Sequence, residues 1–264
     1  MINRNHRPLR GVLSDPDEPA AATALAHRLD LPLLAEPPET PALFLHHSRN
    51  GLALRSSGPN APGPIRVSLD EGRQGQRLRQ ASLKRESLAR ACGLRGGQSL
   101  RIVDATAGLG RDAMVLAALG ARVTLIERHP VIAALLADGL RRARHSHPEL
   151  ATRLQLVEAD SLQWLAALTP AERPEVICLD PMYPAGSTRG AVRKDLQALR
   201  ELPDWPGLAP VDEAALLALA RASATARVVV KRPGRTAPLA GEAPDWQLPG
   251  RSTRFDVYRG LAGD

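Results

Sequence analysis

The segment Asp180-Pro181-Met182-Tyr183 carries the side chains best suited to chemistry on a planar base. The Asp180 carboxylate and nearby backbone carbonyls can accept the hydrogens of an exocyclic amine, and the Tyr183 ring can stack on the face of a base. By itself the segment does not separate an adenine, cytosine or guanine amine, or nucleic acid from other amine acceptors. Tyr183 could also be a partly buried aromatic at the rim of a site.

A glycine turn precedes this segment in the chain, between an apolar stretch and a helix pattern rich in Ala and Leu. Gly108 and Gly110 let the backbone approach a ligand closely, and the start of the following helix offers unpaired N–H groups. The next apolar stretch, 121–126, ends at Glu127, whose carboxylate can bind two ribose hydroxyls. A dinucleotide and an adenosyl sulfonium cofactor both satisfy this pattern.

The elements that position these residues alternate along the chain from residue 100 onward. Short apolar stretches predict strands, and helical patterns lie between them. The expected strands are 100–104, 121–126, 154–159, 175–179, 227–231, 246–248 and 254–258, and the expected helices are 131–144, 162–168, 191–200 and 211–224. This order predicts a parallel sheet with helices on both faces.

Four acidic residues end four successive expected strands: Asp104, Glu127, Asp160 and Asp180. A doubly wound sheet brings such strand ends to one rim. The pattern fits an S-adenosylmethionine site, with Glu127 at the ribose, Asp160 and Ser161 at the adenine edge, and Asp180 near the reacting centre. The turn from Gly108 to Asp112 would surround the methionine portion. For each acid taken alone, an N-cap of the next helix is the alternative.

Residues 1–72 differ in texture, with proline clusters and short apolar runs, and predict a small N-terminal α+β subdomain. Its expected elements are a strand at 11–13, a helix at 19–29, a hairpin of 42–46 with 52–55 around Asn50-Gly51, and a strand at 65–69. A helix over 74–91, within a basic linker at 73–98, leads to the main domain at 99–264.

The formal net charge of +7 and the pI of about 10.3 suit a polyanionic partner such as RNA. Most of the basic residues are arginine rather than lysine, a bias that could reflect genomic composition. In the linker helix, a solvated face is the alternative to phosphate contact. The candidates for RNA contact are Arg77, Lys84, Arg85, Arg189, Arg193, Lys194, Lys231 and Arg232.

Several classes of protein are disfavoured by the composition. The chain of 264 residues has no uninterrupted apolar run of the length that spans a membrane, and its N-terminus leads into no apolar signal region, so we expect a soluble, cytoplasmic protein. Cys92 and Cys178 are expected to be buried, reduced thiols. His145 and His147 lack a third ligand nearby in the sequence, so no metal site is expected.

Four stretches together resemble one family: VDATAGLGRDA at 103–113, LIERHPVIAALL at 125–136, LDPMYP at 179–184 and VVVKRP at 228–233. They are similar to the ribosomal RNA small subunit methyltransferase J family, in order and with matching spacing, over roughly residues 72 to 260. Residues 1–70 match that family poorly. Its members place N2-methylguanosine in the RNA of the small ribosomal subunit.

The resemblance implies an α/β fold with a doubly wound, mostly parallel, seven-stranded, Rossmann-like sheet of the class I methyltransferase type. It implies S-adenosylmethionine as cofactor and 16S rRNA, or the small subunit that contains it, as partner. The implied cofactor contacts are Arg111, Asp112, Glu127, Arg128, Asp160, Ser161 and Asp180. The strand end and the glycine turn described above add Asp104, Gly108 and Gly110 to the expected cofactor site. The chemistry of the segment itself makes Asp180, Pro181 and Tyr183 the expected catalytic residues, with the Pro181 carbonyl as a second acceptor for the amine.

Two other functions share part of the pattern. An NAD(P)-dependent oxidoreductase would use the turn at Gly108 and Gly110 with Glu127, but it leaves the segment from Asp180 to Tyr183 unexplained. A non-catalytic RNA-binding protein on a methyltransferase scaffold is disfavoured by an intact Asp180 and Tyr183. The residues thus favour an S-adenosylmethionine-dependent enzyme that acts on an amine of a base, and the resemblance narrows the expected function to methylation of guanine N2 in small-subunit ribosomal RNA.

Overall fold

The computed structural model describes residues 7–181, 199, 202, 205–250 and 253–261. These residues form two compact units. The first contains residues 7–67, 134–142 and the described residues between 190 and 208. The second contains residues 68–133, 143–181, 209–250 and 253–261.

The first unit is built on a four-stranded sheet in the order β2-β1-β3-β4. Its elements are β1 (Leu9–Ser14), α1 (Pro19–Leu29), β2 (Leu33–Leu34), β3 (Leu43–Ser48) and β4 (Gly51–Ser56). The helix expected at 19–29 and the hairpin around Asn50-Gly51 are confirmed, with β3 and β4 antiparallel. The strand expected at 65–69 is wrong, because only Ile65 forms an isolated bridge, to Leu54.

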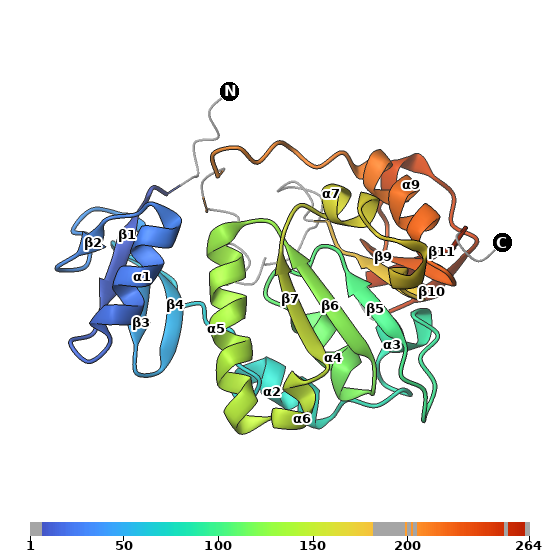
Figure 1. Ribbon diagram of the computed structural model, residues 1–264, viewed down its shortest axis with the longest axis horizontal. Coiled ribbons are helices and arrows are strands. Elements are labelled where there is room, and N and C mark those ends of the chain that lie inside the picture. The colour runs from blue at the N-terminus through green and yellow to red at the C-terminus, as the bar shows by residue number, and fades with distance from the viewer. Residues whose placement is uncertain (1–6, 182–198, 200–201, 203–204, 251–252, 262–264) are drawn as a thin grey trace. The chain divides into compact units, whose positions relative to one another are not determined.

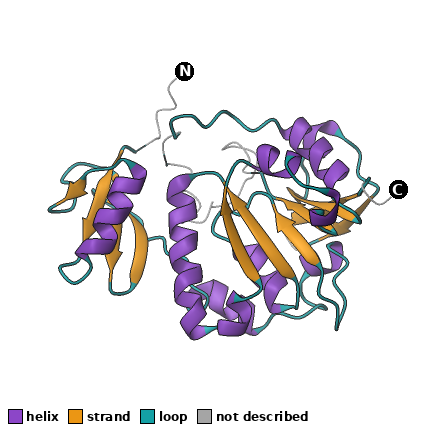
Figure 2. Ribbon diagram, in the orientation of Figure 1, coloured by secondary structure: helices purple, strands orange, loops and turns teal. Residues whose placement is uncertain are grey.

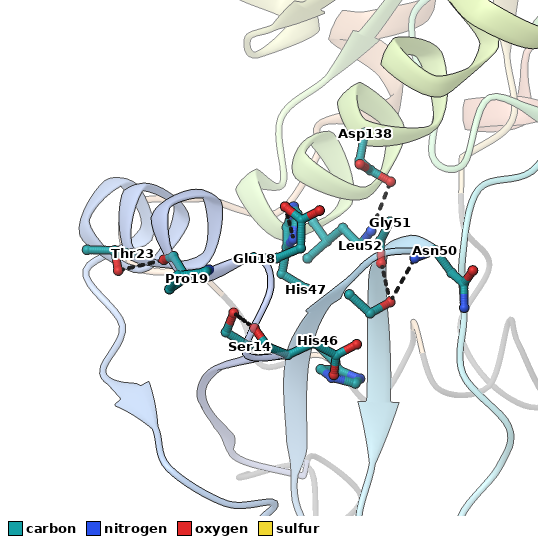
Figure 3. A network of polar contacts seen from close by, with 12 residues as sticks. Ser14, Glu18, Pro19, Thr23, His46, His47, Asn50, Gly51, Leu52 and Asp138 are labelled. Atoms are coloured by element: carbon teal, nitrogen blue, oxygen red, sulfur yellow. Dashed lines mark hydrogen bonds and ion pairs between the residues drawn. The ribbon is translucent and has the colours of Figure 1, made fainter.

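The hairpin turn in this unit is fixed by Asp138, which lies in the helix α5 (Pro130–Ser146). The Leu52 N–H donates to the Asp138 carboxylate at 2.9 Å, as Figure 3 shows. Burial acts to raise the pKa of Asp138, but hydrogen bonds from Arg142 and Leu52 outweigh it and lower the pKa. Gly51 has a φ of +93°, and a Cβ there would overlap Asp138 and Arg142. The positive φ and the close approach of these two side chains therefore both favour glycine at this position.

The second unit begins with two short helices, α2 (Gly72–Arg79) and α3 (Ser87–Ala91). The single helix expected over 74–91 is wrong, because a turn interrupts it. The Ser82 carbonyl accepts the N–H groups of Arg85 and Glu86, and the Ser82 hydroxyl also accepts from Arg85. A serine that binds nearby backbone in this way competes with helix hydrogen bonding.

The seven-stranded sheet of the second unit has the order β10-β11-β9-β8-β5-β6-β7, and β5 to β7 lie side by side in Figure 1. Its strands are β5 (Arg101–Asp104), β6 (Arg122–Glu127), β7 (Leu154–Glu158), β8 (Val176–Leu179), β9 (Arg227–Pro233), β10 (Trp246–Pro249) and β11 (Thr253–Arg259). Only the pairings of β11, with β9 and β10, are antiparallel. The expected doubly wound, mostly parallel, seven-stranded sheet is confirmed, and its strand order reverses between β5 and β8.

Helices border this sheet, as the colouring of Figure 2 shows. They are α4 (Arg111–Ala118), α6 (Pro148–Ala151), α7 (Ser161–Ala166) and α9 (Glu213–Ser223), with single turns at Pro170–Glu172 and Leu239–Gly241. The helices expected at 131–144, 162–168 and 211–224 are confirmed. Most of the helix expected at 191–200 lies outside the described residues. None of the described helices is both long and apolar enough to cross a membrane.

One apolar core lies between the sheet and the helices α7 and α9. Val103, Leu179 and Val230 contribute from three neighbouring strands, and Leu165 and Leu217 contribute from the helices. Since side chains alternate between the faces of a strand, the residues between these core positions face the opposite side of the sheet. That opposite face carries the charged residues of the site.

Candidate active site

The strand register brings Asp180 and Lys231 together at the carboxyl ends of β8 and β9. Cys178 of β8 is paired in register with Val229 of β9, so the next residues on the same face are Asp180 and Lys231. The Lys231 ammonium donates to the Asp180 carboxylate at 2.8 Å. Asp104, at the end of β5, pairs with Cys178 on the other side of β8. Asp104 and Asp180 therefore flank the point where the strand order reverses, which is where such sheets bind ligands.

A row of alternating charges extends from Asp180 toward α2. The Lys231 ammonium also donates to the Asp112 carboxylate at 2.7 Å, and Arg77 donates to the other Asp112 oxygen at 2.7 Å. Arg77 in turn makes two hydrogen bonds to Glu86, at 3.1 and 2.8 Å. Burial acts to raise the pKa of Asp112, but the two cations outweigh it and lower the pKa to about 2. Asp112 is therefore ionised at any physiological pH.

Asp104 is the buried acid of the group, and only 6% of its surface is exposed. Burial and the nearby Asp112 raise the pKa of Asp104 to about 7, although the Thr106 N–H, 3.3 Å from its carboxylate, opposes this. The Thr106 hydroxyl accepts the Asp180 N–H at 2.6 Å. Thr106 therefore connects Asp104, at the end of β5, to the backbone of Asp180, which follows β8.

Asp180 is the more accessible acid, with 46% of its side chain exposed. Desolvation of the Asp180 carboxylate raises its pKa, and the nearby Asp112 carboxylate raises it further. The Lys231 ammonium opposes both effects. Pro181, which follows, is buried. Tyr183, Arg189, Arg193 and Lys194 lie outside the described residues.

Glu127, at the end of β6, is held by backbone groups. Its two oxygens accept the N–H of Gly108 at 2.8 Å and the N–H of His129 at 2.7 Å. Burial raises the pKa of Glu127, and these two hydrogen bonds oppose the effect. Each carboxylate oxygen has a second lone pair, so the residue can still accept ligand hydroxyls. The structure thus places Glu127 against the glycine turn, as a ribose-binding acid requires.

Asp160 is the N-cap of α7, the alternative that the sequence left open for each acid. One of its oxygens accepts the N–H groups of Leu162 and Gln163, at 2.9 and 3.3 Å. Its other oxygen lies 3.6 Å from Arg128, which also donates to the Ala209 carbonyl. The Ser161 hydroxyl donates to the backbone carbonyl of Ala105, the residue after Asp104. The cap uses only the first Asp160 oxygen, and 28% of the side chain is exposed, so capping and ligand binding by the second oxygen are compatible.

The remaining residues of the glycine turn introduce α4. Gly110 is its N-cap, with a φ of +70°, and Arg111 is its first residue. Asp112 lies in the first turn, where a carboxylate is favoured by the helix dipole. The turn thus leads directly from the Glu127 contact at Gly108 to the charge row at Asp112.

Lys231 and Arg232, both candidates for RNA contact because they come at the end of an apolar strand pattern, do not emerge together at one rim. Strand β9 continues to Pro233, so the two side chains point to opposite faces of the sheet. Arg232 is only 6% exposed, and its guanidinium donates twice to the Ala237 carbonyl, at 3.0 and 2.6 Å. It is packed inside the protein and does not offer a surface for phosphate. By contrast, Lys84 and Arg85 are exposed in the turn between α2 and α3.

Sequence reasoning missed the pairing of Lys231 with both Asp112 and Asp180. The available signal was that Lys231 and Asp180 each follow an apolar run that forms a parallel strand, which predicts that the two strand ends meet. Within the described ranges, no cluster of three or more His, Cys, Asp or Glu residues could hold a metal ion.

Comparison with known proteins agrees with this geometry. The family model of SAM-dependent methyltransferases matches residues 24–260. A ribosomal RNA small subunit methyltransferase J of Alkalilimnicola ehrlichii is 96% identical over the full length of both chains. Its namesake in Thioalkalivibrio sulfidiphilus is 49% identical over 90% of this chain and 92% of the relative. The chain belongs to the ribosomal RNA small subunit methyltransferase J family. It is thus an enzyme that uses S-adenosylmethionine, and the dinucleotide alternative is set aside.

A solved structure supports the family assignment at the level of the fold. A SAM-dependent methyltransferase from Neisseria gonorrhoeae superposes with a TM-score of 0.74 at 33% identity, over 96% of this chain and 97% of that one. This match includes the N-terminal residues, where the sequence alone suggested little similarity.

The residues present fit S-adenosylmethionine. Gly108 has a φ of +54°, and no atom of the described residues lies within 4 Å of the position that a Cβ would occupy there. Within the described part of the chain, the turn therefore leaves space beside the buried Glu127 carboxylate, as a bound ribose requires. The accessible oxygen of Asp160 lies at the end of the next strand, where it can accept an adenine amine.

Proposed function

We propose that the protein transfers a methyl group from S-adenosylmethionine to the exocyclic N2 of a guanosine in 16S rRNA of the small ribosomal subunit. The observation that carries this proposal is the Asp180 carboxylate, held beside the strand-order reversal by Lys231 at 2.8 Å and by the Thr106 hydroxyl through its backbone. The names of the relatives support a ribosomal RNA substrate. The resemblance of the segment at 179–184 supports guanine N2.

The amino group of guanine is a poor nucleophile because its lone pair is delocalised into the ring. S-adenosylmethionine supplies an electrophilic methyl group on its sulfonium. The protein must therefore hold the nitrogen in line with that methyl group, which makes the displacement effectively intramolecular. Hydrogen bonds to Asp180 and to the Pro181 carbonyl would orient the amine and favour a pyramidal nitrogen. Stacking of the base on Tyr183 would add about 1–3 kcal/mol.

The raised pKa of Asp180 makes its carboxylate a better proton acceptor than an ordinary aspartate. With nearly half of its side chain exposed, it can reach a base that enters from solution. We assign it both to orienting the amine and to receiving the departing proton. The reaction then leaves a methylated, neutral amine.

For the cofactor, we propose Glu127 at the ribose and Asp160 with Ser161 at the adenine. Arg128 lies 3.6 Å from Asp160 and would help to orient it. The methionine portion would lie against the turn, and the residues assigned to it are Asp104, Gly108, Gly110, Arg111 and Asp112. Since both oxygens of Asp112 already bind cations, its contact with the cofactor would come from the backbone.

For RNA, we propose the exposed turn at Lys84 and Arg85 as a phosphate-binding surface of the basic linker at 73–98. The candidates Arg189, Arg193 and Lys194 extend this proposal to the chain after Tyr183. Arg77 has two acidic partners and would reach phosphate only at the cost of those contacts. A ribosomal substrate in a bacterium also implies a cytoplasmic enzyme.

The test is to incubate the protein with labelled S-adenosylmethionine and small subunits that lack the modification. In parallel, free 16S rRNA is supplied, and the methylated nucleoside is identified by mass spectrometry. N2-methylguanosine, formed by the wild type and lost in Asp180→Asn, is expected. Methyl groups on adenine or cytosine would refute the base assignment. RNA binding without any transfer would favour the non-catalytic alternative.

A further inference from the structure

Lys231 differs from a surface lysine in its number of fixed partners. Its ammonium lies 2.7 Å from Asp112 and 2.8 Å from Asp180, and 29% of its side chain is exposed. These two carboxylates raise the pKa of Lys231 against the opposing effect of burial. The lysine is therefore charged and oriented before any substrate arrives.

The partner of Lys231 on the far side is itself immobilised. Asp112 receives a second cation, Arg77, at 2.7 Å, and Arg77 is fixed by two hydrogen bonds to Glu86. Asp112 is held by its place in the first turn of α4, and Arg77 by its place in α2. The helices α2 and α4 thus fix the position of the Lys231 ammonium. Because Asp180 is the more exposed acid, its carboxylate is the group that the ammonium orients.

We propose that Lys231 is a positioning residue for the reaction: its ammonium, anchored by Asp112, fixes the Asp180 carboxylate in the orientation and charge state that accept the guanine amine. This inference rests on the proposed function of Asp180. It replaces the expectation that Lys231 binds RNA phosphate, because two carboxylates occupy its ammonium. Lys231 binds only one Asp180 oxygen, and among the described residues no side chain occupies the other, which we assign to the substrate.

The two roles of Lys231 predict different kinetics for Lys231→Met. If Lys231 positions Asp180, the substitution should lower kcat by about tenfold or more, because part of the contribution of the Asp180 base is lost. Loss of the cation also raises the pKa of Asp180, which is otherwise surrounded by Asp112 and Asp104. The acidic limb of the kcat profile should therefore move upward by about 1–3 pH units. If Lys231 instead contacts phosphate, Lys231→Met should raise KM for RNA. The salt dependence of RNA binding should then fall by about one counterion.

The experiment measures kcat, KM for small subunits and cofactor affinity from pH 5.5 to 9, with melting temperatures for each variant. Arg259→Met is a matched control, because it removes one positive charge from the same sheet at a side chain that is 77% exposed. It should leave kcat and the pH profile unchanged. If Lys231→Met does not fold, Lys231→Gln serves instead, because its amide still donates to Asp112 without the charge.

A shifted acidic limb and a reduced kcat, with cofactor affinity within about threefold of the wild type, are expected. An unchanged pH profile in a folded variant would overturn the inference, as would an effect on KM for RNA alone. These outcomes are separate from the proposed function, because wild-type product identity tests guanine N2. A wild type that methylates another base would refute guanine N2, while the pH profile would still test Lys231.

Discussion

The acids at the rim of the sheet fall into two groups that are held in different ways. Asp112 and Asp180, the cation-held acids, are fixed by the side chains of Lys231 and Arg77. Glu127 and Asp160, the amide-held acids, are fixed mainly by backbone N–H groups. The cation-held acids lie on the side where we propose methyl transfer, and the amide-held acids lie on the side that we assign to the cofactor nucleoside.

The difference shows how each side depends on the rest of the chain. Backbone N–H groups belong to the scaffold, so the orientation of the amide-held acids depends less on neighbouring side chains than the orientation of the cation-held acids does. The cation-held acids form a row in which each charge needs the next one. Changes on the reacting side should therefore spread along the row, while changes on the cofactor side should remain local.

The largest effect is expected for Asp180→Asn. The amide cannot accept the departing proton and presents a donor to the substrate amine, so the methyl transfer rate should fall about 10²- to 10³-fold. Single-turnover kinetics with saturating cofactor and small subunits measure this. A folded variant with a rate close to that of the wild type would remove Asp180 from the chemistry.

The next largest effect is expected for Asp112→Asn. It leaves Lys231 and Arg77 without their shared carboxylate, and the free energy of unfolding should fall by about 3 kcal/mol. Urea denaturation measures this loss. Because the row is coupled, the rate should also fall even though Asp112 is assigned no proton transfer. A stable variant with normal activity would show that the charges are independent.

Asp104 should give a smaller effect that depends on pH. Its pKa is raised from 3.8 to about 7, so between these values the folded protein retains a proton that the unfolded chain has lost. Stability from this group is therefore greatest at low pH and falls as the pH rises toward 7. Asp104→Asn removes this slope. Between pH 5 and pH 8 the variant should gain about 3 kcal/mol relative to the wild type.

The comparison of unfolding free energies at the two pH values cancels the contributions of other titrating groups. Glu127, whose pKa is also raised, is present in both proteins. Parallel curves for Asp104→Asn and the wild type would mean that Asp104 titrates near its ordinary pKa.

The smallest effect on stability is expected at Asp160, where two variants separate the cap from the ligand contact. Asp160→Ala removes the cap of α7 and should cost about 1 kcal/mol, whereas Asp160→Ser keeps a capping oxygen and should cost little. Both should weaken cofactor binding, because both lose the accessible oxygen. Melting curves and calorimetric titration measure the two effects. Normal cofactor affinity in Asp160→Ala would limit Asp160 to capping.

The sequence predicted the sheet well because its strands are short, apolar and separated by clear helix patterns. The rim acids were also predictable, since Asp104, Glu127 and Asp160 each follow such a strand. The break at Ser82 was missed because the basic residues around it have good helix propensity, while a local serine hydrogen bond decides the outcome.

The error at Arg232 has a different cause. The apolar run of β9 ends at Val230, but hydrogen bonding to β11 continues to Pro233. Strand pairing is a tertiary property, so the boundary at Pro233 was set by its partner Thr253, twenty residues further along the chain. The contacts of Lys231 likewise depend on the register between β8 and β9, which the sequence does not state.

The most direct test of the division between the two groups is a paired measurement on Asp180→Asn and Glu127→Gln. Cofactor affinity is measured by calorimetry, and the methyl transfer rate is measured in single turnovers at saturating cofactor. We expect Glu127→Gln to weaken cofactor binding at least tenfold, with a rate within a few-fold of the wild type. We expect Asp180→Asn to lose the rate while largely retaining cofactor affinity. Equal losses of affinity and rate in both variants would contradict the division.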